Sequence, residues 1–186
     1  MTKLIGTTML TIALGAAGCA LDVGSANEPA DEVTQADLEF YDQSPADIGD
    51  PQAIVTTDLS ADAIAAIGTR GARAIQWFEA HRGSTAYEGL CELAVELSFG
   101  TRGRYPSAID NWHAQVRAGR AHPGDRTPPG GAMVFWNTSS FGHVAVADGV
   151  GGEWSTSVNG RIGHARLSYF NNYLGWAWAP TSWPGR

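Results

Sequence analysis

The sequence predicts an α+β domain in the C-terminal two-thirds of the chain. Apolar side chains recur at helical spacing from about residue 58 to residue 117, and short β-like runs separated by glycine, asparagine and serine turns follow from Pro128 onward. Helices first and strands after them is the order typical of this fold class. A chain of 186 residues has room for one such core and for extra segments at its ends.

Four helices are expected in the first part of the domain. Asp58 or Ser60 caps the first helix and Gly68 closes it, and glycines also close the second and third. The fourth helix starts after Pro106 with Ser107 as its cap. The expected ranges are 58–67, 72–82, 90–99 and 107–116.

Four strands are expected in the second part. Each is a short run rich in β-branched and aromatic residues between turn residues. The expected ranges are 132–136, 143–147, 153–158 and 176–178. We find no internal repeat and no low-complexity tract in the chain.

Residues 1–18 have the pattern of an export signal. Lys3 precedes an apolar run that is too short to span a bilayer, and small residues end the run. Ala16-Ala17-Gly18-Cys19 resembles a bacterial lipobox, which implies a lipid anchor at Cys19 in the cell envelope. The alternative is an ordinary cleaved signal, which would leave a periplasmic or extracellular protein.

Residues 19–56 are predicted to form an acidic, flexible tether. Between Ala20 and Thr69 there are eleven acids and no lysine or arginine, whereas from Arg70 onward eleven arginines stand against eight acids. A segment with so little apolar surface does not offset the entropy of ordering. The alternative is a pro-segment that shields the basic domain until it is removed. The small basic excess suits an anionic polymer such as a cell wall and is too small to predict nucleic-acid binding.

Cys91 and His143 are the residues that point to chemistry. Cys91 lies in the first turn of the expected helix 90–99, where free backbone amides and the helix dipole favour a thiolate. His143 begins the expected strand 143–147 after Gly142. A thiol with a nearby imidazole is the arrangement of a cysteine hydrolase. The alternative for Cys91 alone is a buried structural cysteine.

No metal or other cofactor is expected. The five histidines show no metal-ligand spacing such as HExxH, and two cysteines do not make a zinc site of the usual kind. The other four histidines fall on polar helix faces, in a loop or after a turn.

Several segments, taken in order, resemble one family. They are Tyr87-Glu88-Gly89-Leu90-Cys91, then Pro129-Gly130-Gly131-Ala132-Met133-Val134, then Gly142-His143-Val144-Ala145-Val146, then Tyr173-Leu174-Gly175-Trp176. In this order they are similar to the NlpC/P60 and CHAP group of papain-like cell-wall hydrolases. The resemblance covers residues 74 to 180, nearly all of the domain expected at 57–186. It implies a papain-like fold with N-terminal helices packed on a small antiparallel sheet.

The resemblance also implies an activity. It would make the protein a cysteine peptidase or amidase acting on peptidoglycan stem peptides, with Cys91 as nucleophile and His143 as general base. Tyr87 matches a tyrosine that lies beside the oxyanion site in this family. The implied partner is peptidoglycan or its peptide fragments, with the chain acting as a monomer and touching a membrane only through Cys19.

The chain departs from the family pattern in two places. Glu92 follows the cysteine where a small residue is common, and its carboxylate would oppose the thiolate unless it points away. The third polar residue, about twelve positions after the histidine, is Ser155, with Ser157 on the same strand face by alternation. We therefore expect Ser155 or Ser157 to orient His143.

Two other functions stay open on the sequence alone. One is a catalytically silent wall-binding domain on the same fold, which Glu92 and the serine in third position favour. The other is a secreted toxin that uses the same thiol chemistry on a target outside its own cell.

Overall fold

The computed structural model describes residues 31–185 and has the expected α+β fold. Its helices and strands, all within the described residues, are α1 (Gln35–Phe40), α2 (Ala61–Ala66), α3 (Thr69–Ala80), α4 (Cys91–Ser98), α5 (Ala108–Arg117), β1 (Ala121–Pro123), β2 (Met133–Trp136), β3 (His143–Ala147), β4 (Gly152–Ser155), β5 (Gly163–Arg166) and β6 (Tyr173–Ala177). The expected signal at 1–18, Cys19 and residues 20–30 of the expected tether lie outside the described residues.

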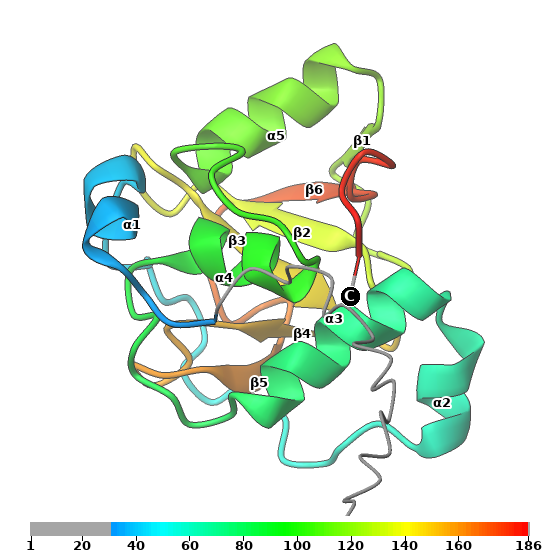
Figure 1. Cartoon of the computed structure of the whole chain (residues 1–186). Coiled ribbons are helices and arrows are strands. Elements are labelled where there is room, and N and C mark those ends of the chain that lie inside the picture. Colours follow the sequence, from blue (N-terminus) through cyan, green and yellow to red (C-terminus); the bar gives the residue numbers. More distant parts are fainter. Residues whose placement is uncertain (1–30, 186) are drawn as a thin grey trace, which may run out of the picture.

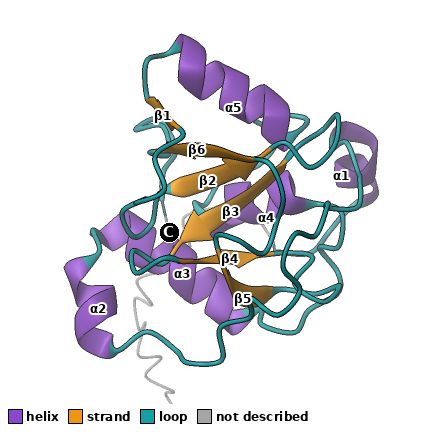
Figure 2. Cartoon of the chain, turned by 180° about the vertical axis from the view of Figure 1, so that it is seen from behind, coloured by secondary structure: helices purple, strands orange, loops and turns teal. Residues whose placement is uncertain are grey.

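The strands form one antiparallel sheet in the order β1-β6-β2-β3-β4-β5. Strands β2 to β5 follow one another as neighbours, and β6 returns to the free edge of β2. Helices α3 and α4 lie on one face of the sheet, and loops cover much of the other, as Figures 1 and 2 show from the two sides.

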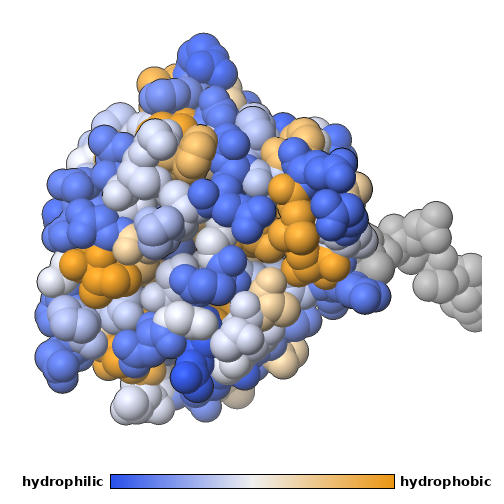
Figure 3. Space-filling view, turned by 90° about the vertical axis from the view of Figure 1, so that its left-hand side faces the viewer, coloured by the Kyte–Doolittle hydropathy of each residue, from blue (hydrophilic) through white to orange (hydrophobic). Residues whose placement is uncertain are grey.

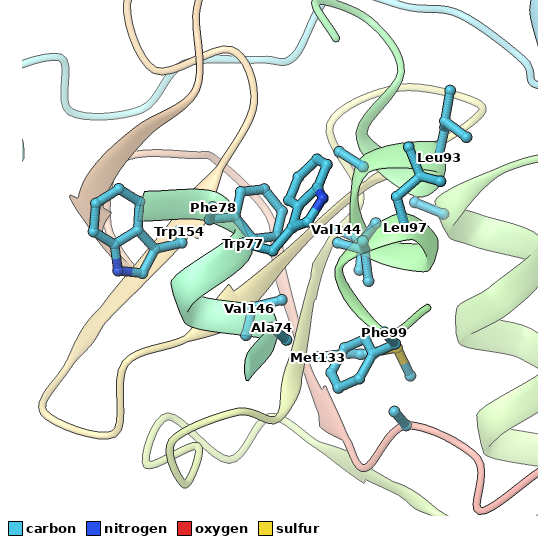
Figure 4. Close-up of a cluster of buried hydrophobic side chains, with 14 of the residues drawn as sticks. Ala74, Trp77, Phe78, Leu93, Leu97, Phe99, Met133, Val144, Val146 and Trp154 are labelled. Atoms are coloured by element: carbon cyan, nitrogen blue, oxygen red, sulfur yellow. The ribbon is translucent and has the colours of Figure 1, made fainter. Parts of the chain in front are cut away.

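The face with the helices carries the larger hydrophobic core. Alternate residues of β2 and β3, such as Phe135 and Val144, point to this face because successive side chains in a strand point to opposite sides. They pack against Phe78 of α3 and Leu93 of α4, all of which are fully or almost fully buried (Figure 4). This packing fixes the start of α4 against β3.

The helix ends follow local sequence signals. Ser60 and Ser107 cap α2 and α5 by accepting the backbone N–H groups of Ala63 and Asp110. Gly100 follows α4 with a φ of 71°, a backbone conformation that glycine adopts readily. Short β1 and β5 and helix α1 were not expected from the sequence, and β4 ends at Ser155 rather than at 158.

The expected flexible tether is wrong for residues 31–56, which we call the strap. The strap carries α1, and it forms bridges to the domain at Ile48 with Phe170 and at Ile54 with Ala165. Tyr41 is 4% exposed in the core on the helix face, and Ala53 is 5% exposed in the core on the opposite face. The strap therefore passes from one face of the sheet to the other.

Polar contacts hold the N-terminal part of the strap. Arg102 Nη1 lies 2.6 Å from Asp37 Oδ2, and the Tyr41 hydroxyl donates to Glu96 Oε2 at 2.7 Å. The residues that form these pairs are 55 to 65 positions apart in sequence. The acidic composition that predicted a solvated segment instead provides partners for an arginine of the domain.

Candidate active site

Cys91 is the first residue of α4, as the sequence predicted. Leu90 precedes the helix without a side-chain cap, so the first backbone N–H groups of α4 are free to point at the sulfur. The backbone N–H groups of Val144 and Glu92 both favour the ionised thiol. The packing of α4 on β3 thus places the thiol beside the peptide that follows His143.

The thiol is nevertheless not acidic in this structure. Cys91 keeps some exposed surface as a residue, but its sulfur is enclosed, and burial raises the pKa of the thiol to about 12. This corrects the expectation that the helix N-terminus gives Cys91 a low pKa. Desolvation of a thiolate outweighs the backbone amides here.

His143 begins β3 and is 2% exposed. Its Nε2 lies 2.6 Å from the Oγ of Ser155, and its ring lies 4.1 Å from the ring of Phe170, centroid to centroid. Burial lowers the pKa of the imidazole to about 3, so His143 is neutral at physiological pH. A neutral imidazole is the form that accepts a proton from a thiol.

The Cys91 sulfur lies at the N–H of Val144, one residue after His143, where β3 and β4 separate. The two strands pair only at Val146 with Trp154 and at Ala147 with Glu153. The start of β3 therefore has no β4 neighbour, and the N–H of Val144 is left for the Cys91 sulfur. Within residues 31–185 no hydrogen bond joins the Cys91 sulfur to the His143 ring. Such bonds are often long in resting enzymes and tighten with substrate.

Of the two serines expected to orient the histidine, Ser155 contacts it and Ser157 does not. Ser155 is the last residue of β4, fully buried, and faces His143. Ser157 lies beyond the strand with a φ of 62°, so the alternation that placed it on the same face no longer applies. Thr156 between them is buried, and its hydroxyl has no hydrogen-bond partner among the described residues.

Tyr87 is 4% exposed and packs edge-on against Trp77. Its hydroxyl donates a hydrogen bond to the backbone carbonyl of Asp31, at the start of the strap. The oxyanion role that the family resemblance implies for Tyr87 stays a prediction, since that hydroxyl is engaged by the strap.

The carboxyl of Glu92 reaches α5, and its negative charge is still one of the causes that raise the pKa of Cys91. Asn111 Nδ2 donates to Glu92 Oε1 at 2.8 Å, and the residue is 3% exposed. Burial, with Glu96 one turn further along α4, raises the pKa of Glu92 well above its ordinary value. The raised pKa favours the uncharged form of Glu92, which does not oppose the Cys91 thiolate. The sequence signal that could have revealed the raised pKa of Glu92 is the presence of two glutamates, Glu92 and Glu96, four positions apart on an apolar helix.

A second buried polar cluster lies further along the sheet. His164 Nε2 is 3.0 Å from Asp148 Oδ2, and the His164 ring stacks on Trp154. Glu153 is fully buried, and burial raises the pKa of its carboxyl well above its ordinary value. Sequence analysis did not single out these residues. The described residues include no group of three or more His, Cys, Asp or Glu side chains arranged to hold a metal ion.

A scan against models of known protein families, a search of curated proteins and a search of solved structures found no match to this chain. Between residues 31 and 185, no helix has the length and apolar character needed to cross a bilayer.

Proposed function

We propose that this chain is an exported cysteine hydrolase, with a papain-like domain of the NlpC/P60 type, that cleaves amide bonds in peptidoglycan stem peptides. One observation carries the proposal. The Cys91 thiol, at the start of α4, lies against the backbone beside His143, and Ser155 holds the far nitrogen of that histidine at 2.6 Å. A nucleophile, a base and a group that orients the base form the arrangement of a thiol hydrolase.

In the proposed reaction, the Cys91 thiol gives its proton to His143 Nδ1, and the sulfur attacks the carbonyl carbon of the scissile amide. For Nδ1 to accept, Nε2 carries the ring hydrogen and donates it to Ser155 Oγ. The tetrahedral intermediate collapses, the C–N bond breaks, and His143 returns the proton to the leaving amine. Water, deprotonated by His143, then attacks the thioester and releases the carboxylic acid together with the Cys91 thiol.

The free N–H groups at the start of α4 would support this reaction. Negative charge develops on the carbonyl oxygen in the tetrahedral intermediate, and preorganised backbone donors stabilise it. Cys91 and Glu92 supply such N–H groups because Leu90 offers no side-chain cap. The raised pKa of Glu92, whose carboxyl is bound by Asn111, reduces the repulsion between that carboxyl and this charge.

A second candidate is a wall-binding domain without catalysis. The observation in its favour is the enclosed pair itself, because burial raises the pKa of Cys91 to about 12 and lowers the pKa of His143 to about 3. In this state proton transfer from thiol to imidazole is strongly unfavourable. The two candidates differ in whether the site opens.

The deciding experiment is mass spectrometry of purified muropeptides incubated with the protein. Because the strap packs on the domain, the incubation uses both the intact chain and a chain from which the residues before Gln52 have been cut away. Cys91→Ser is the matched control, since a hydroxyl has nearly the size of the thiol and is a much weaker nucleophile.

We expect new amine and carboxylate ends in the muropeptides only with the Cys91 protein. Binding to insoluble cell wall with no cleavage by either form of the chain would contradict the hydrolase and support the silent binding domain.

A further inference from the structure

The middle of the strap lies beside the turns that lead into the candidate active site. A Cβ placed on Gly89, two residues before Cys91, would lie 3.8 Å from Gln43 Cβ and 4.0 Å from the backbone of Ser44. The Ser44 hydroxyl is 2.7 Å from that of Ser139, four residues before His143. One short stretch of the strap therefore touches the turns that lead into both candidate catalytic residues.

The next residues of the strap continue past the histidine. Ile48 pairs with Phe170, and the Phe170 ring lies 4.1 Å from the His143 ring. At the N-terminal end of the strap, the backbone carbonyl of Asp31 accepts a hydrogen bond from the hydroxyl of Tyr87. The strap thus contacts neighbours of both Cys91 and His143.

The strap is buried near its two ends and exposed or partly buried in its middle. Tyr41 and Ala53 are buried in the two cores, whereas residues 42–50 are exposed or only partly buried. A cavity of about 480 Å³ lies between Pro45, Ile48 and the domain residues Ser157 and Tyr169. Figure 3 shows the side of the molecule that carries α1, where hydrophobic spots are small and separated by hydrophilic surface. The middle of the strap is attached by hydrogen bonds, such as Gly49 N–H to Tyr169 O at 2.7 Å, and not by buried apolar side chains. Exposed hydrogen bonds of this kind are among the first to open in a native protein.

We infer that the strap is an autoinhibitory segment that closes the Cys91–His143 site, and that substrate enters only after residues 42–50 have moved away. The inference rests on the proposed function for the identity of the site, and it adds how the site is controlled. The strap contains seven acids and no lysine or arginine, and Arg102, which pairs with Asp37, belongs to the domain. Cutting away the strap removes the Asp37 partner of Arg102.

The test measures the accessibility of Cys91 before and after the strap is cut. A site-specific protease sequence is inserted between Pro51 and Gln52, which form an exposed turn, in a full chain carrying Cys19→Ser. Cutting there leaves Ala53 in its core, and the protein folds before it is cut. Gel filtration then removes the N-terminal fragment, and iodoacetamide labelling of Cys91 is followed by peptide mass mapping.

We expect labelling of Cys91 to become at least about tenfold faster after the cut, since reactivity follows thiolate fraction and access. The matched control is Ser44→Cys with Ser139→Cys, whose neighbouring hydroxyls allow a disulfide that keeps the strap in place. In the oxidised control, labelling of Cys91 should stay slow after the cut, and reduction should restore the increase.

Equal labelling before and after removal of the fragment would overturn the inference. So would fast labelling of Cys91 in the cut but oxidised disulfide variant, in which the strap stays in place. Faster labelling without muropeptide cleavage would support the autoinhibitory role of the strap and contradict the proposed hydrolase activity. Cleavage at the same rate by intact and cut chains would support the hydrolase activity and contradict the autoinhibitory role of the strap.

Discussion

His143 gives the protein a specific sensitivity to acid. Burial lowers the pKa of His143 from its ordinary value of 6.5 to about 3. Between these values the unfolded chain binds a proton that the folded chain does not, so the free energy of unfolding falls as the pH falls below 6.5. Each pH unit in this window is worth about 1.4 kcal/mol, so at pH 5 the loss is about 2 kcal/mol.

The matched variant is His143→Gln, which does not titrate and whose amide keeps a polar partner for Ser155. The assay is urea unfolding at pH 7 and at pH 5, followed by the fluorescence of the seven tryptophans. Buried acids such as Glu92 and Glu153, whose pKa is raised by burial, shift stability in the opposite direction in both proteins. The difference between wild type and variant removes their contribution.

We expect the wild type to lose about 2 kcal/mol more than His143→Gln between pH 7 and pH 5. The same pH dependence in both proteins would show that His143 is not held neutral by burial, and it would refute the physical basis of the closed site.

Three further predictions concern residues at or near the site and the predicted anchor. Ser155→Ala should slow hydrolysis about tenfold, or about 1.4 kcal/mol, and His143→Ala should slow it about a hundredfold or more. Ser157→Ala should leave the rate unchanged, and a loss of rate in that variant would show that Ser157 and not Ser155 orients the base. Glu92→Gln should raise the free energy of unfolding at pH 8 and have less effect near pH 4.5, because the folded variant no longer holds a proton that the unfolded chain releases as the pH rises. Urea unfolding measures both proteins at each pH, and a difference between variant and wild type that does not change with pH would contradict this. The full chain expressed in bacteria should partition into detergent through a lipid on Cys19, and Cys19→Ser should release it; a wild type that is exported and remains in the aqueous phase would support a simple cleaved signal.

The elements predicted from sequence are those with local signals. Helices α2 to α5 begin and end within a few residues of the expected positions, because serine caps and glycine stops act on the adjacent turn. Strand β3 has the expected bounds of 143–147, since it is a continuous buried run between turns. Strands β1 and β5 are three and four residues long and carry too short a pattern to be recognised.

The strap was not predictable for a different reason. Its composition is that of a disordered linker, and it is ordered only by partners far away in the sequence. Asp37 pairs with Arg102, and the Tyr41 hydroxyl donates a hydrogen bond to Glu96. No sequence pattern within the strap predicts either interaction.

The sequence by itself determined the identity and order of the chemical groups: a cysteine at a helix start, a histidine at a strand start, and a serine twelve residues later. Helix capping and strand alternation place such residues because they act over a few neighbouring positions. Only the tertiary structure decided their state. Burial raises the pKa of Cys91 to about 12, lowers the pKa of His143 to about 3 and raises the pKa of Glu92 well above its ordinary value. Desolvation depends on atoms packed from distant segments, and no local pattern records it.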